Sequence, residues 1–358
     1  MGVEREGAEG EGSVAEGLGQ GGGSGVEPGP TFIMKDSETE RKKLIDEAAN
    51  IRAEVIALRR APMIVSNSEI ACFRRCPREH NYRYVERVEP IVHADALVRG
   101  RRIHEALANL WTGRDVSLDG LSPADRAMMR AYRAVHGPVW SLRDRMVANV
   151  PFRVELVAGV TLVGELDELG IDAERKEIIV EHKTTSSDVS PGSAYWRDVV
   201  TTNSQASAYC LAFPRATILW DALRKPTLRQ LQANKSRREP ESDEAYEQRC
   251  YEQLTSEPEN FFARAKIVRL ESELEAYKQD VRDVGNVIWT SWDGKAYRNP
   301  DACHTFGRPC DFFDVCWGSS TLDSPQFRRV EKNHTEQVAD RYLNSIEIRA
   351  HKWKEVAK

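Results

Sequence analysis

Long hydrophobic runs are absent from this sequence. Its 358 residues contain no uninterrupted apolar stretch of ~18 residues, the length that a membrane-spanning helix requires. The first residues are acidic and rich in glycine, whereas a secretory signal begins with basic residues and continues into an apolar segment. We therefore expect a cytoplasmic protein that is neither secreted nor bound to a membrane.

Cysteine is scarce, and no nucleotide-binding loop is present. Seven cysteines in a chain of this length are too few for a disulfide scaffold. Their odd number, without a signal peptide, indicates a reducing compartment, in which clustered cysteines more often bind metal or act in catalysis. The phosphate-binding pattern Gly-x-x-x-x-Gly-Lys-Ser/Thr does not occur, so any ATP-driven step would have to come from a partner.

An excess of positive charge, which is common in nucleic-acid-binding chains, is missing too. The chain has 51 basic and 56 acidic residues, a formal net charge of −5. Residues 1–30 contain six glutamates and one arginine, which accounts for the whole deficit. The remainder of the chain is balanced, so contact with nucleic acid would depend on a local basic surface.

The composition changes along the chain and predicts four segments. Residues 1–33 hold 11 of the 23 glycines and almost no large apolar side chains, so we expect a disordered tail, with Met34 as a candidate start. Residues 34–63 are expected to form a charged helix, and residues 64–320 the main domain. A C-terminal helical extension is expected over 321–358.

The main domain begins with helical patterns and continues into strands that alternate with helices. Ser66 and Glu69 form a capping-box pattern at the start of its first helix. This order favours the α/β class, with a mixed central sheet flanked by helices. We expect helices at 66–76, 95–111, from 122, at 193–212, 243–254 and 271–290, and strands at 152–156, 160–170, 177–184, 216–223 and 262–270.

Charged residues occupy two of the predicted strands. Because strand side chains alternate between faces, Glu181 and Lys183 share one face and His182 points to the other. A turn at 172–176 would bring Asp167 close to Glu181. Two carboxylates that close together repel unless a cation such as Mg²⁺ binds them. A surface ion pair between Glu181 and Lys183 is the alternative explanation.

The spacing of these residues resembles the core motif of the PD-(D/E)XK nuclease superfamily. Asp167 is followed, after thirteen residues, by Glu181-x-Lys183, although Leu166 stands where the motif has proline. The resemblance implies a restriction-endonuclease-like fold. It also implies metal ligation by Asp167, by Glu181 and by the backbone carbonyl of His182, with Mg²⁺ or Mn²⁺ as the ion. Lys183 would position the attacking water and stabilise charge on the phosphate.

Further motifs resemble the RecB-type exonuclease branch of the superfamily. They are Gln205-Ala-Ser-Ala-Tyr209, Gly100-Arg-Arg-Ile-His104 and the opening segment "SNSEIACFRRCPREHNYRY", and the resemblance spans residues 64–317. It implies that Gln205 and Tyr209 act in catalysis and hold the DNA backbone, and that His104 ligates the metal or orients its water. Taken alone, His104 and Tyr209 are also explained as core residues. Arg101 and Arg102, beside His104, are the candidates for DNA contact.

Four cysteines extend the resemblance to the iron–sulfur variants of that branch. Cys303, Cys310 and Cys316 lie close together near the C-terminus, and Cys76 lies far upstream. The resemblance implies that the four thiolates hold a [4Fe–4S] cluster that joins the two ends of the domain. The spacing of the last three differs from the tighter family pattern, and a structural Zn²⁺ site requires the same four ligands.

The combined motifs predict a metal-dependent DNA nuclease of a bacterial, archaeal or phage-infected cell. The RecB-type resemblance favours an exonuclease that acts on DNA ends or single strands in recombination, repair or replication-associated processing. Two alternatives stay open. The chain could be the DNA-binding subunit of a helicase–nuclease or recombination complex, with a helicase or recombinase as partner, or it could be an RNA nuclease.

Overall fold

The computed structural model describes residues 63–92, 94–137, 146–157, 159–234, 238–290, 296–304 and 307–344, together with 42–43 and 46–47. The predicted tail over 1–33, most of the predicted helix over 34–63 and residues 345–358 of the predicted extension lie outside the described residues. Residues 42–43 and 46–47 are helical. The chain divides into two units, Met1–Leu58 and Arg59–Lys358, and the fold described below is that of the second.

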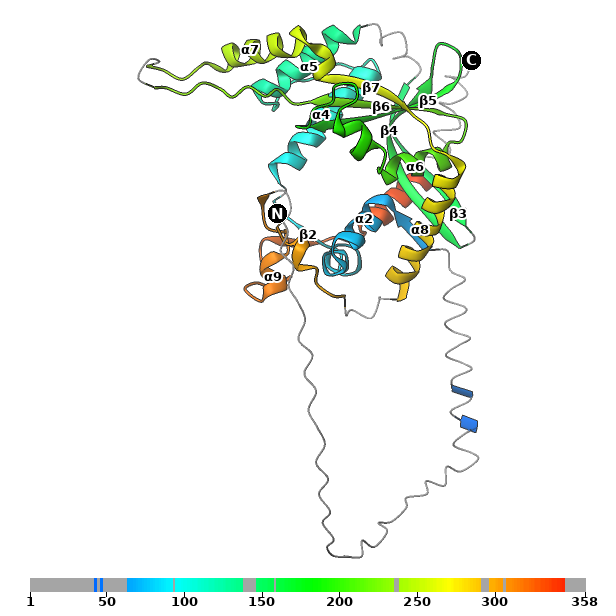
Figure 1. The fold of residues 1–358 in the computed structure, drawn as a ribbon. Coiled ribbons are helices and arrows are strands. Elements are labelled where there is room, and N and C mark those ends of the chain that lie inside the picture. Colours follow the sequence, from blue (N-terminus) through cyan, green and yellow to red (C-terminus); the bar gives the residue numbers. More distant parts are fainter. Residues whose placement is uncertain are drawn as a thin grey trace, which may run out of the picture. The chain divides into compact units, whose positions relative to one another are not determined.

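A six-stranded mixed sheet forms the centre of the second unit (Figure 1). Its strands are β1 (Met63–Ser66), β3 (Met146–Val157), β4 (Val160–Ile171), β5 (Glu177–Thr185), β6 (Thr217–Arg224) and β7 (Phe262–Ile267). The strand order is β1-β4-β5-β6-β7, and β3 pairs with the other edge of β4. The pairs β1–β4 and β5–β6 are parallel, whereas the other pairs are antiparallel.

Helices pack on this sheet in two groups. The helices α4 (Asp95–Trp111), α5 (Pro123–Val135) and α7 (Asp243–Ser256) share one hydrophobic core with the ends of β6 and β7. The helices α2 (Asn67–Arg75), α6 (Ser204–Ala212) and α8 (Glu271–Thr290) share another core with β1, β3, β4 and β5. Neighbouring residues of β5 contact different clusters, as expected for a strand buried on both faces. The predicted α/β class, a mixed sheet flanked by helices, is confirmed.

No helix among the described residues is both long and apolar enough to span a bilayer. Several shorter elements complete the unit. Ser66 caps α2 as predicted, because its hydroxyl accepts a hydrogen bond from the Glu69 N–H at 3.1 Å. The shorter elements are α3 (Pro77–His80), β2 (Val88–Pro90), α9 (Phe313–Trp317), β8 (Phe327–Arg329), the π-helical turns Asn81–Val85 and Tyr195–Val200, and the 3-10 turns Pro258–Asn260 and Pro300–Ala302.

Strand β4 changes its neighbour part-way along one edge. Its residues 160–163 pair with β1, and its residues 168–171 pair with β5 on the same edge. In the described pairing, residues 164–167 join neither β1 nor β5, although β3 continues along the opposite edge. The sheet therefore opens at the end of this stretch, where Asp167 lies.

The alternation of side chains along β3 and β4 is interrupted at the same place. Val147 and Val150 contact one core, although their spacing would place them on opposite faces of a regular strand. Leu166 and Leu169 do the same on β4. Between the two valines, Asn149 has a φ of 54°, in the left-handed region. The pairing on either side of Asn149 keeps one register, so the strand is kinked there without an inserted residue.

The predicted helix over 193–212 is wrong as a single element. The chain forms a π-helical turn over Tyr195–Val200, and α6 begins only at Ser204. The break has a local cause, because the Asn203 side chain accepts hydrogen bonds from the N–H groups of Gln205 and Ala206 at 2.9 and 3.3 Å. An asparagine that satisfies these N–H groups starts a new helix instead of continuing the old one.

The C-terminal extension differs from the predicted helix. It begins with a short strand, since β8 pairs antiparallel with β2, and only residues 334–344 of its described part are helical. The extension is anchored to the start of α2. Thr335 Oγ1 donates to Glu69 Oε2 at 2.7 Å and lies 2.8 Å from Ser66 Oγ, and all three residues are buried.

Gly164 faces the ring of Phe152 across the β3–β4 pair. A Cβ atom added at Gly164 would lie 2.5 Å from Cε1 and Cζ of that ring. We therefore expect Gly164→Ala to lower the free energy of unfolding by about 1–3 kcal/mol, as overpacking of a core does. Urea unfolding of the full chain measures this loss. In a Phe152→Leu background the same substitution should cost less, and an equal loss in both backgrounds would show that the ring is not the cause.

Candidate active site

Asp167 lies where β4 leaves β1 and joins β5. The antiparallel register of β4 and β5 places Asp167 opposite Glu181. The Asp167 side chain extends the pairing, since Oδ2 accepts a hydrogen bond from the backbone N–H of His182 at 2.8 Å. The turn at 172–176 thus brings the two acidic residues together, as expected from the sequence.

Glu181, Lys183, Gln205 and Tyr209 form a closed ring of contacts between β5 and α6. The Lys183 ammonium contacts Glu181 Oε1 and donates to Gln205 Oε1 at 2.8 Å. Gln205 Nε2 donates to the Tyr209 hydroxyl at 2.5 Å, and this hydroxyl donates to Glu181 Oε2 at 2.7 Å. Gln205 and Tyr209 are one turn apart on α6, so both reach the same strand.

Burial and charge together set the ionisation of these groups. Glu181 is 2% exposed, and burial raises the pKa of its carboxyl even beside Lys183. Burial acts to lower the pKa of Lys183, but the charge and hydrogen bond of Glu181 and the charge of Asp167 together outweigh it and the pKa is raised, so the side chain stays an ammonium. Burial acts to raise the pKa of Asp167, but the hydrogen bond and charge of His104 outweigh it and the pKa is lowered.

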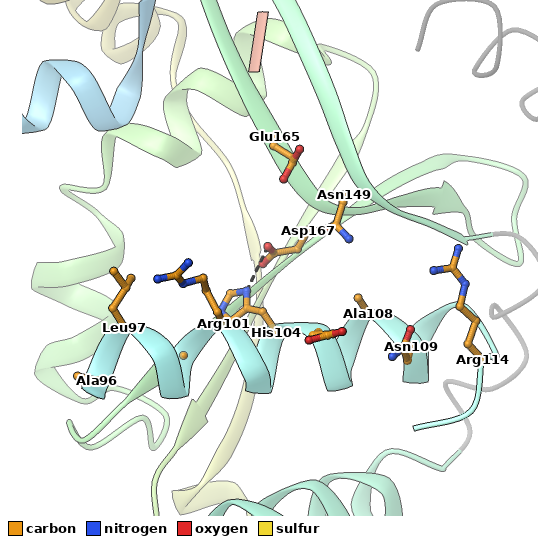
Figure 2. Close-up of a pocket in the computed structure, with 12 residues that line it drawn as sticks. Ala96, Leu97, Arg101, His104, Ala108, Asn109, Arg114, Asn149, Glu165 and Asp167 are labelled. Atoms are coloured by element: carbon orange, nitrogen blue, oxygen red, sulfur yellow. Dashed lines mark hydrogen bonds and ion pairs between the residues drawn. The ribbon is translucent and has the colours of Figure 1, made fainter. Parts of the chain in front are cut away.

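An open pocket of about 670 Å³ gives solvent access to Asp167 (Figure 2). His104 borders it from α4, and its Nδ1 atom lies 3.2 Å from Asp167 Oδ1. Arg101 lies almost one turn earlier on the same helix and also lines the pocket. The lining residues are Ala96, Leu97, Gly100, Arg101, His104, Glu105, Ala108, Asn109, Arg114, Asn149, Glu165 and Asp167.

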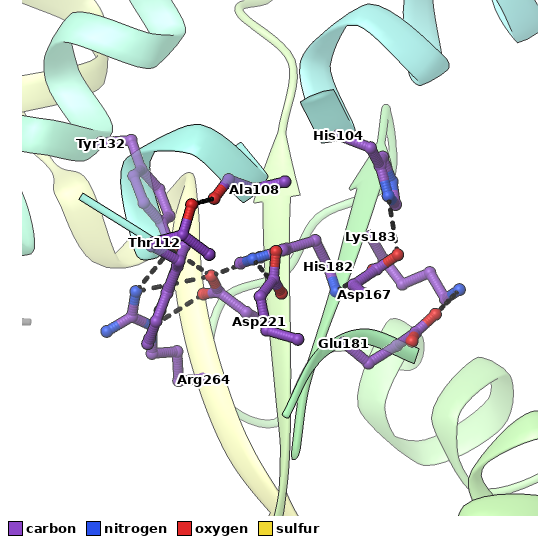
Figure 3. Close-up of polar contacts among 12 residues, drawn as sticks. His104, Ala108, Thr112, Tyr132, Asp167, Glu181, His182, Lys183, Asp221 and Arg264 are labelled. Carbon is purple, nitrogen blue, oxygen red and sulfur yellow. Dashed lines mark hydrogen bonds and ion pairs between the residues drawn. The ribbon is translucent and has the colours of Figure 1, made fainter. Parts of the chain in front are cut away.

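A buried charged network surrounds the side chain of His182, on the face of β5 opposite to Glu181 and Lys183 (Figure 3). His182 Nε2 lies 3.0 Å from Glu168 Oε2, and Nδ1 lies 2.9 Å from Asp221 Oδ2. Asp221 also accepts from Arg264 Nε at 2.8 Å and contacts the Tyr132 hydroxyl. Burial acts to lower the pKa of His182, but Glu168 and Asp221 outweigh it, and the pKa is raised well above its usual value.

This network was not predicted from the sequence, because the family resemblance implies a role for His182 only through its backbone. The network joins three adjacent strands, since Glu168 lies on β4, His182 on β5 and Asp221 on β6. All three side chains are fully buried. The available signal was one further ionisable residue inside each of the three strands. Only the pairing register shows that these three side chains are neighbours.

Three of the four predicted DNA contacts do not line the pocket. Tyr209 is 1% exposed and its hydroxyl contacts Glu181, so it supports the site from behind and does not face solvent. Gln205 is half-buried and turned toward Lys183 and Tyr209. Arg102 does not line the pocket, because its guanidinium donates to the Gly120 carbonyl at 2.6 Å. Arg101 is the predicted contact that lines the pocket.

The fold brings Cys76 to the C-terminal cysteines. Asn299 Nδ2 donates to the Arg75 carbonyl, next to Cys76, at 2.8 Å. Cys310 N–H donates to the Cys303 carbonyl at 2.8 Å, and Cys316 is near enough to Cys76 and Cys303 for their charges to act on it. Even so, no three His, Cys, Asp or Glu side chains in the described ranges are grouped to hold a metal ion.

A sequence profile of the PD-(D/E)XK nuclease superfamily matches residues 64–317, more than half of the 358-residue chain. The chain belongs to this superfamily. Membership makes it a nuclease, that is, a phosphodiester hydrolase, and nucleases of the PD-(D/E)XK superfamily generally use Mg²⁺ or Mn²⁺. The matched range contains the pocket, the ring of contacts around Glu181 and all four cysteines of the predicted cluster.

Two solved structures are similar to this PD-(D/E)XK chain at low identity. A candidate exonuclease from Eubacterium rectale is 12% identical over 75% of this chain and 91% of its own, with a TM-score of 0.42. The solved structure of SSO0001 is 13% identical over 63% of this chain and 76% of its own, with a TM-score of 0.34. No curated protein matches the chain at a significant level.

Proposed function

We propose that this nuclease is a Mg²⁺- or Mn²⁺-dependent DNA exonuclease of the RecB-type branch that acts on DNA ends or single strands. The observation that carries the proposal is the ring in which Lys183 and Tyr209 hold Glu181 beside Asp167. The proposal includes a role in recombination, repair or replication-associated processing, with a helicase or recombinase as partner.

The donor set at this site fits a hard divalent cation. The carboxylates of Asp167 and Glu181 and the backbone carbonyl of His182 would hold it, and Mg²⁺ takes such oxygen ligands while keeping several waters. The Asp167 side chain is 23% exposed, so water and phosphate oxygens can reach it. When bound, the cation supplies positive charge to the phosphate and makes water a better nucleophile at neutral pH.

The side chains around the carboxylates have distinct proposed roles. Lys183 is the cation nearest to Glu181, so its ammonium would orient water and stabilise charge on the phosphate. His104 would orient Asp167 and water beside it, since its ring contacts Asp167 and borders the pocket. Gln205 and Tyr209 would keep Lys183 and Glu181 in place through their hydrogen bonds.

Digestion of end-labelled nucleic acids tests the proposed function. The full chain is incubated with single- and double-stranded DNA and RNA of one sequence, in Mg²⁺, Mn²⁺ or EDTA. We expect DNA to be shortened from its ends in either metal, and to stay intact in EDTA or with Asp167→Asn. Faster cutting of RNA would identify an RNA nuclease. Binding of DNA without cutting would identify a DNA-binding subunit, and neither binding nor cutting would refute the proposal.

We also propose that Cys76, Cys303, Cys310 and Cys316 hold a [4Fe–4S] cluster. The support is that chain segments more than 200 residues apart are joined around Cys76 by several hydrogen bonds. Cluster binding would have to draw the four sulfurs to a common centre. Four thiolates also suit Zn²⁺, which is the alternative.

Anaerobic purification distinguishes the two metals. We expect about four iron atoms and as many sulfides per chain, with broad visible absorbance. Cys316→Ser should lose the absorbance, whereas Cys250→Ala, in the core that α4, α5 and α7 share, should keep it. A colourless protein that contains zinc would contradict the cluster.

A further inference from the structure

The pocket extends from Asp167 along α4 to the end of that helix, where Arg114 lies (Figure 2). The helix ends in a glycine turn that fixes the position of Arg114. Gly113 has a φ of 70°, its N–H donates to the Leu110 carbonyl at 3.4 Å, and the Arg114 N–H donates to the Asn109 carbonyl at 2.9 Å. This pair of bonds is the Schellman motif, so the Arg114 backbone is held by the helix itself.

The four arginines on or just after α4 fall into two pairs. Arg99 is bound to Asp125, and Arg102 to the Gly120 carbonyl, so both hold the fold together. Arg101 and Arg114 are exposed, line the pocket and form no hydrogen bond or ion pair with any residue that the structure describes. Their guanidinium groups are therefore available to a ligand in the pocket.

Asn149 stands across the pocket from α4, next to Asp167. The β3–β4 register places Asn149 opposite Asp167, and its exposed side chain lines the pocket (Figure 2). Its left-handed backbone produces the kink in β3. Glycine adopts this conformation at the least cost, and asparagine is one of the few other residues that tolerate it. Asparagine, unlike glycine, also offers amide N–H donors at this position.

We propose that Arg114 and Asn149 form a subsite for a phosphate group of the substrate strand, beyond the phosphate that is cut at Asp167. The inference rests on the proposed nuclease function and adds the path of the strand, which would run along α4 from Arg101 past His104 to Arg114. Guanidinium and amide N–H groups are common donors to phosphate oxygens. The end of α4 is ~10 Å beyond His104 along the helix axis, so Arg114 would meet a different phosphate.

The proposal also predicts a substitution that strengthens binding of the strand, at Glu105. Glu105 is exposed on α4 and lines the same pocket. A carboxylate there repels a phosphate that passes between Arg101 and Arg114, so Glu105→Gln should strengthen binding of the strand. Glu165 also lines the pocket, but it is paired with Arg341 at 3.2 Å.

Binding of a fluorescent single-stranded oligonucleotide to the full chain tests the subsite, in Ca²⁺ and over a range of salt concentrations. Arg114→Ala should weaken binding about tenfold and reduce the slope of log affinity against log salt by about 0.7, the value for one contact to a single strand. Asn149→Gly keeps the kink but removes the amide, so it should weaken binding without lowering the unfolding midpoint. Arg215→Ala is the matched control, since Arg215 is exposed between α6 and β6 and does not line the pocket.

The outcomes separate this inference from the proposed function. Weaker binding by Arg114→Ala and Asn149→Gly, with Arg215→Ala unchanged and Glu105→Gln tighter, supports the subsite. If the parent chain cuts DNA but Arg114→Ala and Asn149→Gly bind like Arg215→Ala, the subsite is wrong and the nuclease assignment stands. If the parent chain neither binds nor cuts nucleic acid, the proposed function fails and the subsite fails with it.

Discussion

Lys183→Met is expected to slow the proposed DNA hydrolysis by about 10²–10³-fold, the loss that follows removal of one preorganised charged donor from an active site. Lys183 contacts Glu181 and Gln205, and its ammonium lies 5.2 Å from the centre of the Trp220 ring. Methionine keeps the length and packing of the side chain but removes the charge. The loss should therefore appear in kcat of end-labelled DNA digestion, with a smaller change in KM.

The effect on catalysis must be separated from an effect on folding. Without Lys183, the Glu181 carboxylate is buried beside Asp167 without its cation, which destabilises the fold. Adding Glu181→Gln to Lys183→Met removes that unpaired charge, so stability should recover while activity stays lost. Lys278→Met is the control, because Lys278 pairs with Glu275 on the surface of α8. A Lys183→Met enzyme as fast as the Lys278→Met enzyme would overturn the role of Lys183.

The sequence was sufficient to predict the fold class and the meeting of the two carboxylates. Both depend on local patterns, namely the period of the strands and a five-residue turn, and the register of β4 and β5 agrees with them. Helix α2 with its Ser66 cap was predictable for the same reason. These features need no information about residues that are distant in the chain.

The missed features depend on long-range contacts. Strand β1 is only four residues long and is formed by pairing with β4, almost 100 residues later. The direction of Tyr209, inward toward Glu181, follows from the packing of α6 on the sheet and not from its helical position alone. The kink at Asn149 has a weak local signal, since asparagine tolerates a positive φ, but its place opposite Asp167 required the β3–β4 register.

Asp221→Asn is expected to lower the free energy of unfolding by about 3–5 kcal/mol, the usual cost of removing one partner from a buried ion pair. Asp221 is fully buried and contacts His182, Arg264 and Tyr132 at once. Asparagine fills the same space but carries no charge, so Arg264 loses its carboxylate and His182 keeps only Glu168. Urea unfolding of the full chain, compared at equal m-values, measures the loss.

An exposed ion pair provides the comparison for the buried ion pair between Asp221 and Arg264. Arg197 and Asp198 are bonded at 2.8 Å on the surface, where water and salt screen their charges, so Asp198→Asn should change stability too little to resolve. If Asp221→Asn cost no more than Asp198→Asn, the network around His182 would not be a source of stability. Arg264→Gln removes the other member of the pair and completes a double-mutant cycle, in which the two losses should be less than additive.

The same substitution should also affect the active site, because the network and the motif share one residue. The His182 side chain is fixed by Glu168 and Asp221, while its backbone N–H holds Asp167 at 2.8 Å and its carbonyl is the proposed metal ligand. Weakening the side-chain anchor therefore loosens β5 where two proposed ligands, Glu181 and His182, are adjacent. We expect Asp221→Asn to weaken Mn²⁺ binding, measured by calorimetry on the folded protein, whereas Val88→Ala, which destabilises the fold in the separate cluster between β2 and β8, should leave Mn²⁺ affinity unchanged. Equal Mn²⁺ affinity in the two variants would mean that the network stabilises the sheet without positioning the site.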